Sequence, residues 1–312
     1  MQTERVSASF RATGVRSRSY AQLGRACLVG ALLRLACVLS LHPEPAWDGK
    51  IYERAAEQLA HGEGYTQRIL DPFAPARATA FFPPGFPAVL SILHRAAGGR
   101  ALDRFFQIAI SVALIPCAWL FGRRLGGVRA GTWAAWLIAL WPGGILLSAS
   151  WLTEPLFSWQ LSAALLPTLY ARRRKRGRAL AITALLLGIA AYVRPTALAI
   201  APFVGAAVGG SRPTHKLTAA ISGSVVALVV ACLPLVPWAV RNQHAVYAPV
   251  LVSTNAGYNL LLGTIGDGSY ERLEPAFDCP AGASEIALDR CRRERALSRI
   301  ARAPIAWFGR GA

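Results

Sequence analysis

The chain has 312 residues, of which 54% are hydrophobic and 16% are charged, and its mean hydropathy is +0.37. So few charged residues cannot cover the surface of a soluble domain, and several separate apolar runs of spanning length indicate an integral membrane protein. The net charge of +18 would suit a nucleic-acid partner. However, the arginines form short clusters between apolar runs, as at 171–178, which is typical of cytoplasmic loops, so no nucleic-acid partner is predicted.

The first predicted element is a basic cytoplasmic tail over 1–20, which we expect to be disordered because it is rich in Ser and Arg and lacks apolar periodicity. A transmembrane domain follows over 21–238. Its apolar runs predict about seven spanning helices, at 21–41, 101–122, 127–147, 151–170, 178–193, 195–210 and 216–238. The predicted fold class is an all-α integral membrane protein.

A shorter apolar run at 86–99 decides the topology. It contains His94 and Arg95 and is too short to cross a bilayer. If it did cross, the basic cluster at 171–178 would face outside, against the positive-inside rule. We therefore predict a juxtamembrane or re-entrant helix within an external loop at 42–100.

This topology puts the N-terminus in the cytoplasm and the segment 239–312 outside. Of the sixteen Asp and Glu residues, all but Glu4 then fall on the outer face or at its edge. Acidic residues have little influence on topology, so this sorting needs a cause of its own. Either the two large polar segments simply both lie outside, or an active site lies there, and the two explanations are compatible.

In the external loop, the spacing predicts a helix that begins at Asp48 and ends at Gly62 and Gly64. Its apolar face, suited to lying on the membrane, consists of Ile51, Tyr52, Ala55 and Leu59. On spacing alone, Asp48 is better explained as a helix N-cap than as a functional carboxylate.

Two ionisable residues stand at the outer ends of predicted spans. Glu154 begins the span at 151–170, where it is either a wetted end residue or part of a site. Arg194 lies between two apolar runs and is followed by Pro195, which frees backbone carbonyls that an arginine could satisfy. A guanidinium fixed there would also suit a lipid phosphate.

Further polar candidates follow the last span. Arg241 and Asn242 stand at its outer end, where interfacial anchoring is the plain explanation. The segment 252–271 is rich in Asn and Gly and is expected to be a loop. Its Asn255, Tyr258 and Asn259 would suit sugar or phosphate contacts, although such residues also make ordinary turns.

The six cysteines show no zinc-like spacing, so no metal site is predicted. Four of them lie in apolar runs. Cys279 and Cys291 share one polar segment and could form a disulfide if that segment faces an oxidising compartment.

Taken in order, these motifs resemble a known family. They are D-x3-Y-x3-A from Asp48, G-x-G-Y at 62–65, PPG-aromatic-P at 83–87, T-E at 153–154, R-P at 194–195, P-W-x2-R-N at 237–242 and T-N-x-G-x-N at 254–259. The ordered set is similar to the GT-C membrane glycosyltransferases that use polyprenyl-phosphate sugars. That group includes protein O-mannosyltransferases and lipid A aminoarabinose transferases, and the resemblance runs from about residue 25 to the end.

The resemblance implies that Asp48 is the catalytic carboxylate and deprotonates the acceptor hydroxyl. Arg194 and Arg241 match basic positions that would offset the charge of the leaving phosphate, and Glu154 matches a structural or acceptor-site position. We include Tyr52, Asn242, Asn255 and Asn259 among the substrate-binding candidates. The implied acceptor is a lipid, glycan or protein, and membrane lipids are expected around the protein. No cofactor is required by the implied chemistry, although a divalent cation could take part.

The implied location is a bacterial inner membrane with the active face extracytoplasmic. Family members usually continue into further spans, whereas this chain stops after 296–312, so we expect a short variant, a truncated product or part of a larger assembly. Two other functions stay open. One is a transporter or lipid-binding membrane protein. Transporters tend to have ionisable residues near the middle of the membrane, and here only Arg34 lies well inside a span. The other is a non-catalytic homologue of the same fold.

Overall fold

The computed structural model describes residues 2–210, 216–265, 279–280 and 283–310. Within these ranges the chain is helical and contains no β-strand, apart from an isolated bridge between Thr66 and Ala78. The predicted all-α class is therefore confirmed. The chain divides into two compact units, unit 1 (residues 1–64 and 85–234) and unit 2 (residues 65–84 and 235–312).

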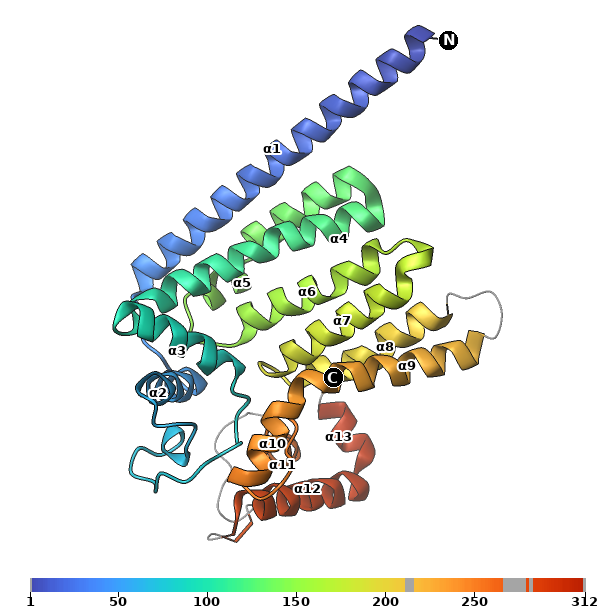
Figure 1. The fold of residues 1–312 in the computed structure, drawn as a ribbon. Coiled ribbons are helices and arrows are strands. Elements are labelled where there is room, and N and C mark those ends of the chain that lie inside the picture. The colour runs from blue at the N-terminus through green and yellow to red at the C-terminus, as the bar shows by residue number, and fades with distance from the viewer. Residues whose placement is uncertain (1, 211–215, 266–278, 281–282, 311–312) are drawn as a thin grey trace. The chain divides into compact units, whose positions relative to one another are not determined.

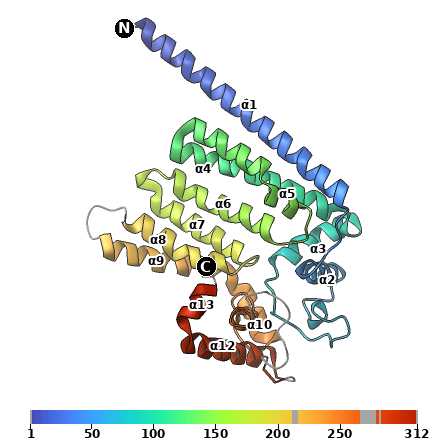
Figure 2. The ribbon, with the colours of Figure 1, turned by 180° about the vertical axis from the view of Figure 1, so that it is seen from behind.

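Unit 1 holds helices α1 to α9 (Figure 1). They are α1 (Gln2–Leu41), α2 (Asp48–His61), α3 (Gly85–Ala97), α4 (Asp103–Leu140), α5 (Pro142–Ser148), α6 (Glu154–Tyr170), α7 (Arg176–Ala191), α8 (Thr196–Gly210) and α9 (Lys216–Cys232). Short 3-10 turns precede α4 and α7. Helices α6 to α9 lie side by side in both ribbon views, and α1 packs along α4 (Figures 1 and 2).

Helix α1 begins at Gln2, so the structure differs from the disordered tail expected over 1–20. The run contains no proline and a single glycine, Gly14, so nothing in its backbone chemistry ends the helix before the apolar part. Absence of an apolar stripe is thus a poor indicator of disorder where a long helix continues into the segment.

Helix α4 is a helical hairpin (Figure 2). Gly127 interrupts it with φ 81° and ψ −170°, a conformation open mainly to glycine, and the chain folds back there. The two arms touch closely, because a Cβ added to Gly122 would lie 2.7 Å from the Ala130 carbonyl oxygen. The predicted run at 101–122 therefore lies in the first arm of this hairpin, and the run at 127–147 covers its second arm and most of α5.

Among the described residues, three helical stretches are long and apolar enough to cross a membrane: Arg18–Leu41, Arg100–Leu140 and Lys216–Ala245. This is fewer than the seven spans predicted from hydropathy. The hairpin in α4 combines two predicted spans. Helices α6, α7 and α8 are only 17, 16 and 15 residues long, partly because prolines interrupt the chain near their ends.

Helices α7, α8 and α9 pack through small residues. A Cβ added to Gly205 would lie 2.2 Å from the Gly223 carbonyl oxygen, and one added to Gly188 would lie 2.1 Å from the Ala231 carbonyl oxygen. Alanines 201, 227 and 231 are buried in the same core. Backbones that approach this closely are typical of helix packing in membranes. There the hydrophobic effect does not drive helices together, and small residues allow close van der Waals contact instead.

Arg34 lies fully buried between α1, α4 and α5. Its guanidinium donates to Ser111 Oγ at 2.7 Å and to the carbonyl oxygens of Ile138 and Ala139 at 3.1 Å each. The Ile138 carbonyl cannot receive its helical hydrogen bond because Pro142 has no N–H. Arg34 thus satisfies carbonyl oxygens at the end of α4.

Unit 2 consists of α10 (Val236–Ala245), α11 (Ala256–Leu262), α12 (Glu285–Arg302), α13 (Pro304–Arg310) and the segment 65–84, which contains a 3-10 turn at Gln67–Ile69. Residues 256–262, expected to be a loop, form a short helix. The Asp289 carboxylate explains this, because Oδ1 accepts from the Gly257 N–H at 2.6 Å and so caps the first turn of α11.

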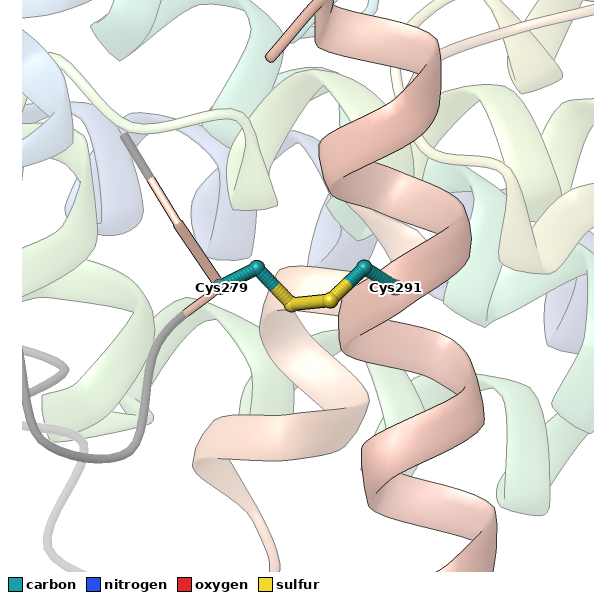
Figure 3. The surroundings of a disulfide bond; sticks show 2 residues. All are labelled: Cys279 and Cys291. Carbon is teal, nitrogen blue, oxygen red and sulfur yellow. A yellow bond between two sulfur atoms is a disulfide. The ribbon is translucent and has the colours of Figure 1, made fainter. Parts of the chain in front are cut away.

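A disulfide joins Cys279 to Cys291 of α12 (Figure 3), with 6.2 Å between the two Cα atoms. The bond ties the segment before α12 to the second turn of that helix.

Candidate active site

The candidate site in unit 1 is built from four segments far apart in the sequence: the start of α2, the start of α3, the turn before α6 and the turn between α7 and α8. Figure 1 shows that α2 and α3 are neighbours. Each of these segments contacts at least two of the others.

Close backbone approaches fix the first two junctions. Gly49 lies against Trp151, since an added Cβ would be 3.2 Å from the Trp151 Cβ atom. Gly85 donates its N–H to the Tyr192 carbonyl oxygen at 2.7 Å and leaves no room for a Cβ there. The D-x3-Y motif is thereby held against the T-E segment, and the PPG motif against the R-P turn.

Tyr52 lies at the centre of these segments. Its ring meets the Phe86 ring edge to face at 5.4 Å between centroids, and its hydroxyl hydrogen-bonds the Thr153 side chain. Burial, together with the nearby Asp48 carboxylate, raises the pKa of Tyr52. The phenol therefore stays protonated and serves as a neutral hydrogen-bonding group.

Arg194 and Glu154 form an ion pair beside Tyr52. Arg194 donates from Nη2 to Glu154 Oε1 at 2.5 Å and from Nε to Thr153 Oγ1 at 2.8 Å. The arginine side chain is 40% exposed, so its outer edge faces solvent. The other oxygen, Glu154 Oε2, is buried and has no hydrogen-bond partner among the described residues.

Asp48 is the first residue of α2. The capping position is Trp47, which has φ 50° and makes no side-chain cap hydrogen bond. The N-cap explanation favoured by spacing therefore does not describe Asp48. Although Asp48 is solvent-accessible, partial burial raises its pKa; Glu154 raises it further and Arg194 lowers it.

A buried polar network supports the turn that carries Thr153 and Glu154. Gln107 donates from Nε2 to the carbonyl oxygens of Ser150 and Leu152 at 2.7 and 2.9 Å. Asp103 accepts from Trp151 Nε1 at 3.3 Å and is hydrogen-bonded to His94 at 2.7 Å. We did not single out Gln107 or Asp103 from the sequence, where a polar pair four residues apart in an apolar run was the available signal.

The remaining predicted site residues belong to unit 2, where most of them bond to the protein itself. Arg241 donates to the Thr79 and Tyr65 carbonyl oxygens at 2.7 and 2.9 Å, and its guanidinium lies 4.8 Å from the Trp238 ring centroid. Asn242 is fully buried and donates to the Val250 carbonyl oxygen at 2.8 Å. Arg241 and Asn242 hold unit 2 together in this structure.

Two further amides complete the predicted set. Asn255 accepts a hydrogen bond from Ser253 Oγ at 2.9 Å, as in an ordinary polar turn. Asn259 is exposed on α11. A more extensive network centres on Glu285, which accepts from Thr79 Oγ1 at 2.6 Å and from Thr254 Oγ1 at 2.5 Å, and which sequence reasoning did not single out.

Within the described ranges, no three His, Cys, Asp or Glu side chains come together as a group that could hold a metal ion. No protein-family model matches the chain, and no curated protein matches it. The functional interpretation therefore depends on the sequence motifs and on the geometry of the Asp48 site.

Proposed function

We propose that the protein is a membrane glycosyltransferase that moves a sugar from a polyprenyl-phosphate donor to an acceptor hydroxyl on the extracytoplasmic face. One observation carries the proposal. Four motifs that resemble those of the GT-C enzymes meet around Asp48, Tyr52, Glu154 and Arg194, although they are spread over about 150 residues.

The chemistry assigns a role to each group. Asp48 takes the proton of the acceptor hydroxyl while the acceptor oxygen bonds to the anomeric carbon and the carbon–oxygen bond to phosphate breaks. Polyprenyl phosphate leaves with the bonding electron pair, and Arg194 offsets its added negative charge. Attack opposite to the leaving group inverts the anomeric configuration.

The unpartnered Oε2 atom of Glu154 suits a hydroxyl of the sugar or acceptor, because a buried carboxylate oxygen without a hydrogen bond is costly, by about 1–3 kcal/mol. Tyr52, protonated and hydrogen-bonded to Thr153, holds the start of α2 against the turn that carries Thr153 and Glu154. Arg241 and Asn242 then act as structural residues of unit 2, and a direct contact with the donor phosphate is assigned to Arg194 alone.

The proposed topology keeps the seven spans, with α2 and α3 in an external loop and the N-terminus in the cytoplasm. Three observations support it. With this topology the arginine clusters follow the positive-inside rule. Cys279 and Cys291 are bonded, and α6 and α7 are about 25 Å long at 1.5 Å per residue. That length is close to a hydrocarbon core of about 30 Å, given local thinning.

A transporter is the less favoured alternative, because Arg34, the only charge deep in a predicted span, is satisfied by backbone carbonyls and does not line a path. The test is sugar transfer in proteoliposomes supplied with labelled polyprenyl-phosphate hexoses and pentoses, scored by release of polyprenyl phosphate. We expect Asp48→Asn to reduce turnover at least about 100-fold, the size of a general-base effect. Asp71→Asn, an exposed carboxylate outside the site, is the matched control; full turnover in Asp48→Asn would sink the proposal.

A further inference from the structure

A cavity of about 490 Å³ opens at the end of unit 1 opposite the Asp48 site. Helix α6 begins at Glu154 in the site and ends at Tyr170 beside the cavity, so the two places are about 25 Å apart along that helix. One wall is apolar and the rim is basic. The apolar lining includes Leu165, Leu169, Phe203 and Val204, and the basic lining consists of Arg124 and Arg176.

A second cavity of about 460 Å³ lies on the other side of the α7 start, between α7, α8 and α9. It shares Arg176 and Val208 with the first cavity and adds Arg173 and Arg174 to the basic rim. Arg176 therefore lines both cavities, and each cavity is also lined by apolar side chains.

The stretches of chain that line the two cavities carry basic residues and no acidic ones. No Asp or Glu occurs from residue 104 to 153 or from 155 to 266, and these stretches supply both cavities. Arg124 is held at the rim because its Nε donates to the Leu169 carbonyl oxygen at 2.9 Å. The uncapped start of α7 adds the positive end of a helix dipole at Arg176.

The arginines favour an anionic ligand, and the apolar wall indicates which kind of anion fits. Phe203 is 75% exposed and lies beside Val204 in the first cavity, so this wall is an open apolar surface next to a cluster of arginines. A soluble anion would leave that surface uncovered. A lipid phosphate with its acyl chain satisfies both parts, and anionic lipids concentrate in the cytoplasmic leaflet that the positive-inside rule assigns to this end.

We propose that the paired cavities around Arg176 form a binding site for an anionic phospholipid, with the headgroup phosphate on Arg124 and Arg176 and an acyl chain along Phe203. The site is separate from the proposed sugar-transfer chemistry. A lipid bound there ties α4, α6, α7 and α8 together at the cytoplasmic end.

The test is native mass spectrometry of the detergent-purified protein titrated with phosphatidylglycerol, with phosphatidylcholine of the same chains as reference. We expect the first phosphatidylglycerol to bind at least tenfold more tightly than phosphatidylcholine. The double variant Arg124→Gln/Arg176→Gln should lose that preference. Arg124→Lys/Arg176→Lys, which keeps the charges, should retain most of the affinity and shows that the loss is not a failure to fold.

The matched control is Arg129→Gln/Arg178→Gln, which removes two exposed arginines of the same end that line neither cavity. It should bind phosphatidylglycerol as the wild type does. Equal losses in both double variants would mean general charge attraction and would overturn the site. Competition by millimolar glycerol phosphate as strong as by the lipid would assign the arginines to a free phosphate and would likewise overturn it.

Discussion

At the scale of single residues, the surroundings of Asp48 set the protonation of its carboxyl group. Asp48 has partial burial and Glu154 raising its pKa, while Arg194 lowers it. A general base works only in its ionised form, so activity should rise with pH through the raised pKa of Asp48 and not through that of an ordinary aspartate.

The sign of two substitutions follows. Glu154→Gln removes a group that raises the pKa of Asp48, so the acid limb of the pH–rate profile should move to lower pH. Arg194→Gln removes a group that lowers it, so the limb of its residual activity should move to higher pH. The measurement is initial rate against pH for the three proteins in one buffer series. Shifts in the same direction for both variants would contradict the assignment of Asp48.

The residues themselves were only partly predictable. Glu154 and Arg194 stood out because each is an ionisable group next to an apolar run, where its placement costs energy and needs a reason. Asp48 was a helix-start residue on spacing alone, and its catalytic role came from the family resemblance. Gln107 escaped notice because its importance lies in hydrogen bonds to two backbone carbonyls that no local pattern reveals. Arg241 donates to carbonyl oxygens of the protein in this structure, and a basic residue at a helix end looks the same in the sequence whether it binds a ligand or such carbonyls.

At the scale of elements, α2 formed with the bounds that its sequence predicts. It begins at Asp48, and Gly62 ends it with φ 79° while donating back to the Gln58 and Leu59 carbonyl oxygens. Its apolar face, expected to lie on the membrane, instead buries Tyr52 and Ala55 within the protein, where α2 packs on α3. Periodicity predicts which face is apolar, but not which surface covers it.

Helix lengths and helix turns were harder to predict. Hydropathy does not show how two apolar runs are joined. In α4 the tight turn between them depends on the conformation of one glycine, Gly127. The helix at 256–262 depends on Asp289, which is more than 30 residues away in the sequence. Long-range caps of this kind leave no trace in the local pattern.

Close packing of α8 on α9 gives a prediction at this scale. Gly223→Ala would place a methyl group 2.3 Å from the Gly205 carbonyl oxygen, so the helices must separate. We expect a loss of about 2 kcal/mol or more in the free energy of unfolding, the size seen for overpacked cores, measured by denaturant titration in detergent. Gly24→Ala, which meets nothing within 4 Å, should be neutral or slightly stabilising. Equal stability of the two variants would count against the close contact between α8 and α9.

At the scale of the whole molecule, the proposed function depends on sidedness. The seven-span topology places α2 outside and the start of α7 inside, and a membrane-impermeant maleimide can read both in cells. In a background where the free cysteines are replaced by serine, Lys50→Cys should be labelled in intact cells, whereas Arg174→Cys should be labelled only after the membrane is opened. The reverse pattern, or labelling of both in intact cells, would contradict the topology.

The central claim is that the Asp48 site binds a polyprenyl-phosphate sugar, and an experimental structure with the product polyprenyl phosphate bound in lipid nanodiscs tests it most directly. We expect the phosphate to lie within hydrogen-bonding distance of the Arg194 guanidinium, with Asp48 facing the position of the anomeric carbon. Phosphate density away from Arg194, with Asp48 facing protein or lipid only, would contradict the claim.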